Sequence, residues 1–541
     1  MKLIRPLPRA VTRPFTAIVF LAWGITIGVL VHRSYVQAST TLAADLARYG
    51  SDAQWRGVYY KGEKIGFTVG QTTVSDDGFE LQEDGRLQMS LLGAVSAARI
   101  RTTASVDRAF ALRTFEFSLD PGTGPVEVSG QVVGVTLHLS VKTASGVYTE
   151  TRELTEPPML TLNLARKLAN GGLVPGARHQ WTVFDPATLQ NAPVILEVGT
   201  RENTRVGNTR IPAFRVDMAF GSLRTTSWIT DTGEVVREES PMGLITVRES
   251  ARDAQRLAIG GQMQSDLLEA AAVVPETTQR IDEPRDVRLL RLRLDGADLS
   301  SADVQGAGQT VSAGVIEIVD ARTLQAGPAD PDARRYLAPE PLIESDAPEI
   351  RAEAERAVGA ATGGRARAEK LVRHVNGLLE KKPTVSIPSA REVLRTKVGD
   401  CNEHTALFVA MARSIGIPSR IAVGLAFVRG AFYYHAWPEV YIDEGGGRGL
   451  WLPVDPTFNQ FPADATHLRL ARGGLDRQAS IVPLIGRLKI AILDVTLAPG
   501  STPTIVGRQA DDFGPLSIPI PQRSAGGCWS SPSIAPRPGA R

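Results

Sequence analysis

Apolar residues recur at helical spacing from residue 401 to about 415, and this spacing predicts a helix over that range. The positions that carry the spacing are Leu407, Phe408, Met411 and Ile415. Asp400 is a preferred residue for the cap before a helix, and Glu403 stands where a capping box requires an acidic residue. The pattern therefore predicts a capped helix with Cys401 in its first turn.

Segments rich in aromatic and β-branched residues follow this helix and predict strands. The expected strands are Arg420–Val428, Phe432–Ile442 and Gly449–Val454. Strand side chains alternate between two faces. One face of the second strand is therefore expected to carry His435, Trp437, Glu439 and Tyr441. If the second and third strands pair antiparallel, His435 lies beside Asp455, which follows the third strand.

Upstream of this region, period-two alternation and frequent turn residues favour β structure. Arg288–Leu294 alternates clearly, and Val315–Val319 is expected to pair with it. The expected segments are 1–45, an N-terminal signal anchor; 46–255, a β-rich domain; 256–285, a linker; 286–335, a small β module; 340–498, a mixed domain; and 499–541, a disordered tail. The β-rich domain is expected to act as an inert spacer or as a binding platform.

The N-terminal segment has the pattern of a membrane anchor. The basic residues Lys2, Arg5, Arg9 and Arg13 precede an apolar run from Phe15 to Val31. This run is at the short end for a membrane-spanning helix and long for a signal peptide, so an uncleaved anchor is expected. The basic excess predicts a cytoplasmic N-terminus. The expected location is a bacterial inner membrane, crossed once, with the body in the periplasm or another extracytoplasmic space.

Composition excludes several classes of function. The net charge is +2 and no basic stripe follows the N-terminus, which argues against binding to nucleic acid. Only two cysteines are present, Cys401 and Cys528, so no disulfide framework is expected. Of the seven histidines, only His404 stands at a ligand-like spacing from a cysteine, so neither a metal site nor a cofactor is expected.

The order Cys401, His435, Asp455 supplies a nucleophile, its base and the group that orients the base. The first turn of a helix has unpaired N–H groups and a positive dipole, and both favour a thiolate. A lowered pKa is therefore expected for Cys401. Glu403 is interpreted as a cap and His404 as a packing residue, while Trp437 either shields the site or belongs to the core.

Four stretches carry a resemblance to a known family. They are Asp400–Thr405, Gly416–Arg420, His435–Trp437 and Asp455–Thr457. Together they resemble the transglutaminase-like superfamily, over about 340–475. The resemblance implies an α+β, papain-like core in which a helix bearing the cysteine packs on an antiparallel sheet. It also implies Cys401 as nucleophile, His435 as base and Asp455 as the orienting group.

The expected function is that of a membrane-anchored cysteine hydrolase or acyltransferase, most simply a peptidase or amidase. Its substrate would be an amide of a protein, a peptide or the cell wall. The oligomeric state is left open, as are the substrate and the choice between hydrolysis and amine transfer. The alternative is a non-catalytic envelope scaffold that keeps the fold.

Overall fold

The computed structural model describes residues 49–505 except for 92–93, 123, 221–222, 241–242, 257–271, 297–298, 300–301, 383–386, 388, 475–476, 479–480, 482–486 and 502–503. The predicted anchor at 1–45 and nearly all of the predicted tail at 499–541 lie outside the described residues. Among the residues that are described, no helix has both the length and the apolar character that a membrane crossing requires.

An antiparallel sheet of 14 strands forms the N-terminal part of the molecule. Its strands in chain order are β1 (Gln54–Tyr60), β2 (Glu63–Ser75), β3 (Gly78–Leu91), β4 (Ala94–Asp107), β5 (Leu112–Asp120), β6 (Val126–Val133), β7 (Thr136–Thr143), β8 (Gly146–Glu153), β9 (Arg178–Asp185), β10 (Gln190–Val206), β11 (Thr209–Phe220), β12 (Leu223–Ile229), β13 (Val235–Glu239) and β14 (Leu244–Arg248). β1 pairs with both β2 and β14, so β8 and β9 form the two edges. The predicted β-rich character of this segment is confirmed.

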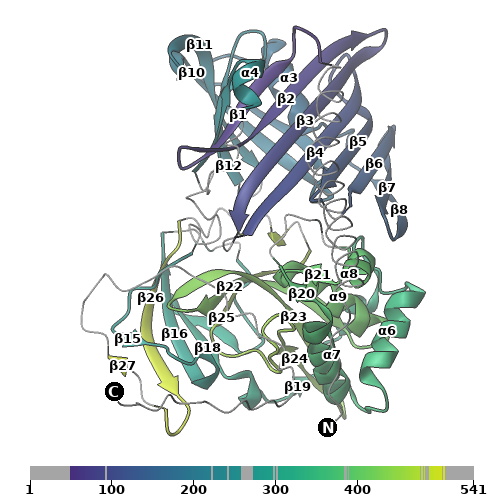
Figure 1. Ribbon diagram of the computed structural model, residues 1–541, viewed down its shortest axis with the longest axis vertical. Helices are drawn as coiled ribbons and strands as arrows, with labels where there is room; N and C mark the ends of the chain where they lie inside the picture. The colour runs from purple at the N-terminus through teal and green to yellow at the C-terminus, as the bar shows by residue number, and fades with distance from the viewer. Residues whose placement is uncertain are drawn as a thin grey trace, which may run out of the picture.

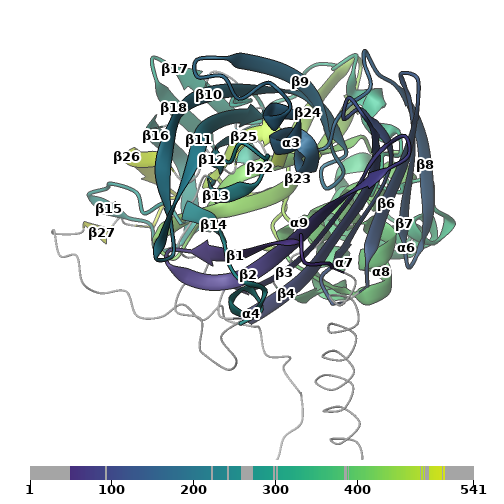
Figure 2. The same cartoon turned by 90° about the horizontal axis from the view of Figure 1, so that it is seen from above.

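The large sheet curls strongly, as seen from above in Figure 2. The short helices α3 (Leu164–Ala169) and α4 (Ala251–Ala254) belong to the same segment. One apolar cluster of this sheet extends beyond it, because it includes Leu342 and Ile387. The sheet is therefore packed against the C-terminal half, which lies below it in Figure 1.

A second sheet joins segments that are far apart in the sequence. Its order is β17 (Gln309–Ser312), β18 (Val315–Val319), β16 (Val287–Asp295) and β26 (Lys489–Leu497). The predicted pairing of the two alternating segments is present, with Leu290 opposite Ile318. However, β26 crosses the predicted boundary between the small module and the mixed domain. One hydrophobic cluster also spans both, because it contains Leu290 as well as Phe408.

The C-terminal half is a mixed region of helices and a five-stranded sheet. The sheet order is β19 (Gly327–Pro328), β24 (Arg448–Pro453), β23 (Ala431–Gly445), β22 (Ser419–Val428) and β25 (His467–Arg472). The helices are α6 (Pro348–Val358), α7 (Gly364–Leu378), α8 (Ala390–Thr396) and α9 (Cys401–Ser414). The short strands β20 (Glu380–Lys381) and β21 (Val398–Gly399) pair with each other, as do β15 (Gln279–Arg280) and β27 (Thr504–Ile505).

The predicted helix on an antiparallel sheet is confirmed. α9 packs on β22 and β23, and all pairings within β22–β25 are antiparallel. α9 is buried over almost its whole length, because α6, α7 and α8 cover it on the side away from the sheet. The cysteine helix is therefore a core element of the region, with only its first turn reaching the surface.

Candidate active site

The first turn of α9 has the predicted cap. Asp400 Oδ1 accepts a hydrogen bond from the N–H of Asn402 at 2.9 Å, and Glu403 Oε2 accepts from the N–H of Asp400 at 2.8 Å. The capping box is thus complete. His404 is fully buried and its Nδ1 lies 2.7 Å from the carbonyl oxygen of Asp400, to which it donates. Glu403 and His404 therefore serve the helix start, as interpreted from the sequence.

The expected lowering of the Cys401 pKa is wrong for this geometry. Cys401 is partly buried, and burial raises the pKa of its thiol well above the ordinary value. The carboxylate of Asp400 raises this pKa further, while the backbone N–H of Ala436 lowers it. The sequence argument weighed the helix terminus alone. Desolvation and the carboxylate that caps the helix both act against ionisation of the thiol.

Strand β23 extends beyond its neighbour β24. The edge of β23 that β24 leaves unpaired forms hydrogen bonds with α9 instead. The pairing with β24 begins at Glu439, so the backbone of Ala436 lies outside it. The carbonyl oxygen of Ala436 accepts a hydrogen bond from Thr405 Oγ1 at 3.0 Å, and its N–H contacts Cys401. Since His435 is the preceding residue on β23, the thiol contacts this strand one residue away from the position that carries the imidazole.

The predicted pairing of His435 with Asp455 is present in the core. His435 Nε2 lies 2.8 Å from Asp455 Oδ2, and the two residues are 4% and 0% exposed. The other oxygen, Oδ1, accepts from the backbone N–H groups of Thr457 at 2.6 Å and Phe458 at 2.9 Å. Burial alone would raise the pKa of Asp455, but the His435 and His467 imidazoles outweigh it and hold the pKa far below its usual range. Asp455 is thus an ionised acceptor.

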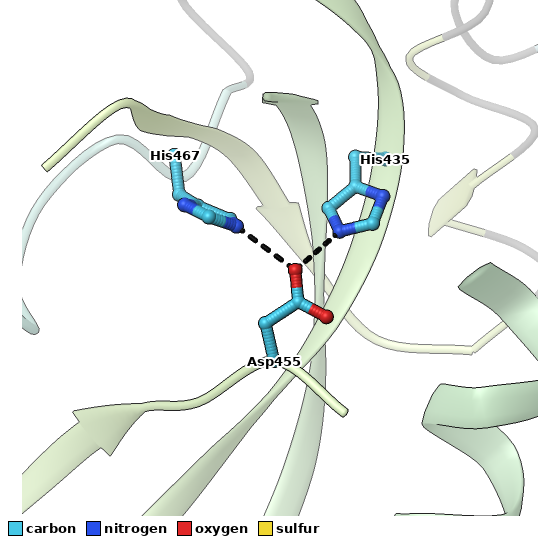
Figure 3. A group of neighbouring side chains, drawn as sticks. All are labelled: His435, Asp455 and His467. Atoms are coloured by element: carbon cyan, nitrogen blue, oxygen red, sulfur yellow. Dashed lines mark hydrogen bonds and ion pairs between the residues drawn. The ribbon is translucent and has the colours of Figure 1, made fainter. Parts of the chain in front are cut away.

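A second histidine, which the sequence argument missed, shares the same carboxylate oxygen. His467 Nε2 lies 3.1 Å from Asp455 Oδ2, and Figure 3 shows the two imidazoles converging on it. His467 Nδ1 lies 3.1 Å from the carbonyl oxygen of Asp464 and 3.2 Å from its Oδ1. Its only signal in the sequence is the spacing Asp464-Ala465-Thr466-His467, which is common in turns.

The partners of the two histidines determine where their protons are. A carbonyl oxygen and an ionised carboxylate only accept hydrogen bonds, so both ring nitrogens of His467 must carry hydrogen. His467 is therefore an imidazolium. Burial lowers its pKa, but the bonds to Asp455 and Asp464 outweigh burial and raise it to about 10. By the same argument His435 carries its hydrogen on Nε2. Its Nδ1 points away from Asp455 and remains free to take a proton (Figure 3).

His435, Asp455 and His467 also form a set with the residue types of a metal site. Their nearest ligand atoms all lie within 4.8 Å of one another. A metal would need both Nε2 atoms as unprotonated donors. The second carboxylate, Asp464, instead favours the protonated form of His467. The hydrogen-bonded arrangement thus explains the cluster without a metal, and no cofactor is required by it.

Aromatic rings enclose the imidazole of His435. Phe458 stacks on it with a centroid separation of 4.6 Å and an interplanar angle of 7°. Trp437 stacks at 6.0 Å and 20°, which places it on the same strand face, as predicted. Trp437 is 1% exposed, so it is both a core residue and a shield for the histidine. These rings keep water from the His435–Asp455 hydrogen bond and strengthen it.

Comparison with known proteins finds solved structures that are similar at low sequence identity. No curated protein matches the chain. A crystal structure from Cytophaga hutchinsonii, described as a candidate cysteine protease, is similar at 17% identity and a TM-score of 0.26, over 43% of this chain and 90% of that one. One from Parabacteroides distasonis, described as a candidate protease, is similar at 13% and 0.19, over 62% of this chain and 64% of that one. A β-barrel-like protein of a domain of unknown function from Brucella abortus is similar at 13% and 0.29, over 37% of this chain and 96% of that one.

The family comparison covers the elements that build the site. Residues 351–456 match the family model of the transglutaminase-like superfamily. The matched range contains Cys401, His435 and Asp455, and ends before His467. The chain therefore contains a domain of the transglutaminase-like superfamily.

Proposed function

We propose that this protein is a membrane-anchored, extracytoplasmic cysteine enzyme that cleaves or transfers an amide acyl group through a thioester on Cys401. The observation that carries the proposal is the buried hydrogen bond from His435 to Asp455. It lies one residue from the backbone N–H that contacts the thiol. A nucleophile, a base in the correct tautomer and an ionised orienting group are the parts that acyl transfer needs.

The first half-reaction follows from the proton positions. Cys401 Sγ attacks the amide carbonyl carbon while its proton passes to Nδ1 of His435. Because burial raises the pKa of the thiol, this transfer accompanies the attack instead of preceding it. The imidazolium then gives the proton to the amide nitrogen as the C–N bond breaks. An amine leaves, and the acyl group remains on Sγ as a thioester. As the first residue of α9, Cys401 also has a backbone N–H without an intrahelical partner, which suits the oxyanion.

The second half-reaction decides the class of enzyme. His435 Nδ1, unprotonated again, takes a proton from water or from a second amine as either attacks the thioester carbonyl. The C–S bond then breaks, and the imidazolium returns the proton to Cys401 Sγ. Water gives a carboxylic acid, and the enzyme is then a peptidase or amidase. A second amine gives a new amide, and the enzyme is then an acyltransferase. Hydrolysis is the outcome in a site that admits water, because a transferase must exclude it.

The location is part of the proposal and rests on the sequence. Four basic residues precede the apolar run Phe15–Val31. This pattern favours a cytoplasmic N-terminus and a body on the other side of the membrane. The amide substrates available there are those of envelope proteins, peptides and the cell wall.

The decisive experiment is alkylation of the full-length protein with iodoacetamide over a range of pH, with Cys401 quantified by peptide mass spectrometry. At pH 7 we expect His435→Ala to slow alkylation of Cys401 by about 10²-fold, the lower range for a lost general base. Above pH 10 the two proteins should react alike, because hydroxide then removes the thiol proton in both. Cys528 in the same chain provides the internal control, since His435→Ala should not change its rate.

Equal alkylation of the two proteins at pH 7 would show that His435 does not serve the thiol. The non-catalytic scaffold would then be the better description. If the rates differ as expected, a fluorescent primary amine supplied with envelope peptides separates the two enzyme classes. A transferase attaches the amine to the peptides, whereas a hydrolase releases free acid.

A further inference from the structure

Asp455 and three neighbouring side chains form a row in which negative and positive charges alternate. His435 Nε2 and His467 Nε2 bond to the same oxygen of Asp455, at 2.8 and 3.1 Å, and the centroids of the two rings are 5.6 Å apart. The other ring nitrogen of His467, Nδ1, lies 3.2 Å from Asp464 Oδ1. From the His435 ring, the row therefore passes through an anion and a cation and ends at a second anion.

The five-stranded sheet brings the two imidazoles together. β22 lies between the strands that carry them. Gly424 of β22 is opposite His435 of β23, and Ala426 of β22 is opposite His467 of β25. Gly424 and Ala426 are two positions apart, so they share one face of the sheet with both histidines. Because neither has a side chain larger than a methyl group, β22 leaves room between the two rings, which converge on Asp455 (Figure 3).

Other charged and titratable groups are packed around this row on α9, β20, β23 and β25. They are Asp400, Cys401, Glu403, His404, Lys381, Glu439 and Arg469. The two carboxylates of α9 belong to the capping box, and Glu439 and Arg469 are bound to each other. Burial lowers the pKa of His404, so that ring is uncharged at neutral pH. Lys381 acts on Asp455 through its charge, whereas His467 bonds to it directly.

The charge of His467 opposes the effect of Asp455 on His435. A carboxylate that bonds to a single imidazole favours the protonated ring, because opposite charges attract. The His467 cation shares the oxygen that His435 uses, and it would repel a second positive ring whose centroid is 5.6 Å away. Compared with a pair of one histidine and one aspartate, the row therefore favours the uncharged form of His435. This is the form that can accept the Cys401 proton.

We propose that His467 is a positioning residue whose fixed positive charge weakens the attraction of Asp455 for a protonated His435. His435 then stays an uncharged base between turnovers, and its protonated form gives up the proton more readily when the amine leaves. In that step the Nδ1–H bond breaks, the amide nitrogen takes the proton, and the electron pair of the C–N bond stays on the nitrogen. The inference rests on the proposed function, because it assigns a role to His467 within that reaction.

The test follows the protonation of His435 by NMR in the full-length protein with isotope-labelled histidine. The background is Cys401→Ser, which removes the thiol whose titration would couple to that of the ring. We expect His467→Gln to raise the midpoint of the His435 titration by about one pH unit, the lower range for a charge a few ångströms away. In the background protein, His467 itself should keep both ring protons from pH 5 to pH 9, because its pKa is raised to about 10.

Two further variants separate the charge of His467 from its packing. His467→Lys keeps a cation at this position and should undo most of the rise seen in His467→Gln. Lys381→Gln is the matched control, because it removes an exposed cation of β20 that also acts on Asp455. It should raise the midpoint by less than about half a pH unit, since solvent and salt screen an exposed charge. A role of His467 in packing alone would not move the midpoint in this order.

An unchanged His435 midpoint in His467→Gln would overturn the inference and leave the proposed function intact, which the alkylation of His435→Ala tests separately. Equal rises in His467→Gln and Lys381→Gln would also overturn it, because the shared oxygen would then have no effect of its own. If His467→Gln does not fold, the background protein decides. Loss of a ring proton from His467 near its ordinary value of about 6.5 overturns the inference, and retention to pH 9 supports it. If His435→Ala leaves the alkylation of Cys401 unchanged, the proposed function fails, and the role of His467 fails with it.

Discussion

At the scale of single residues, Asp455 is the centre of the site, because its carboxylate accepts four hydrogen bonds. Two come from the imidazoles of His435 and His467, and two from backbone N–H groups. A carboxylate with this many donors stays ionised in the core. It can therefore hold the hydrogen of His435 on Nε2. His467 acts through Asp455, so we regard it as a positioning residue.

His467 should make the stability of the protein depend on pH. Its pKa is raised from an ordinary value near 6.5 to about 10. The stabilisation is therefore fully present below about pH 6.5 and is lost as the pH rises through about 10. We expect His467→Gln to lower the free energy of unfolding by about 3 kcal/mol at pH 6, the cost of breaking a buried ion pair. Chemical denaturation at pH 6, 8 and 10 measures this difference, which should shrink at the highest pH.

The matched control for that series is His138→Gln, which replaces an exposed histidine of β7. It should cost less than about 0.5 kcal/mol at every pH, as surface substitutions do. If His467→Gln costs the same free energy at pH 6 and pH 10, His467 is not the imidazolium that its partners require.

Sequence reasoning selected Cys401, His435 and Asp455 as candidates because each stands in a short pattern with local meaning. The capping box and the period of two are both properties of neighbouring residues. It could not find His467, whose partner Asp455 lies 12 positions earlier and beyond a loop. It also gave the wrong direction for the pKa of Cys401. The burial of Cys401 depends on which other segments pack over the helix start, and the sequence of the helix alone does not determine this.

At the scale of elements, the five-stranded sheet is held at its centre by one buried carboxylate. Glu439 of β23 is fully buried and binds three arginines, Arg420 of β22 and Arg469 and Arg472 of β25. Burial would raise the pKa of Glu439, but the three guanidinium groups outweigh it and lower the pKa to about 2. This cluster fixes the strand that carries His435 relative to the strand that carries His467.

Removal of this charge should destabilise the whole region. In Glu439→Gln three cations lose their common anion, and we expect a loss of about 3 to 5 kcal/mol in the free energy of unfolding. The control is Glu317→Gln, which breaks the exposed pair with Arg291 and should cost no more than about 1 kcal/mol. Urea denaturation at pH 7 compares the two variants. Equal losses would mean that the buried cluster contributes no more than a surface pair.

The elements themselves were largely predictable, whereas their long-range partners were not. The helix expected from 401 to about 415 is α9, Cys401–Ser414, and the three strands after it lie within a few residues of their expected bounds. In contrast, the pairing of β16 with β26 joins residues about 200 positions apart, as in Leu290 opposite Val495. Periodicity indicates which face of a strand is apolar, but it does not identify the strand that pairs with it, because many strands share the same pattern.

At the scale of the whole molecule, the curled N-terminal sheet and the mixed region share an apolar cluster and a cavity lined by Asn402, the residue after Cys401. The sequence left open whether this β-rich domain is a spacer or a binding platform. Asn191 of this domain and Asn402 of the mixed region line the same cavity, so the two parts of the chain together form the surface beside the start of α9. This conclusion required the fold, because Asn191 and Asn402 are 211 positions apart in the chain.

The proposed location makes a prediction for the chain as a whole. A phosphatase that is active only after export, fused after residue 45, should be active in bacterial cells, because the proposal places the basic residues before Phe15 in the cytoplasm and the body beyond the membrane. Replacing Arg5, Arg9 and Arg13 by glutamate in the same fusion should remove this bias and lower phosphatase activity by at least about tenfold. A fluorescent protein that matures only in the cytoplasm, fused at the same position, provides the reciprocal control. Strong fluorescence together with inactive phosphatase would place the body in the cytoplasm and would remove envelope amides from the candidate substrates.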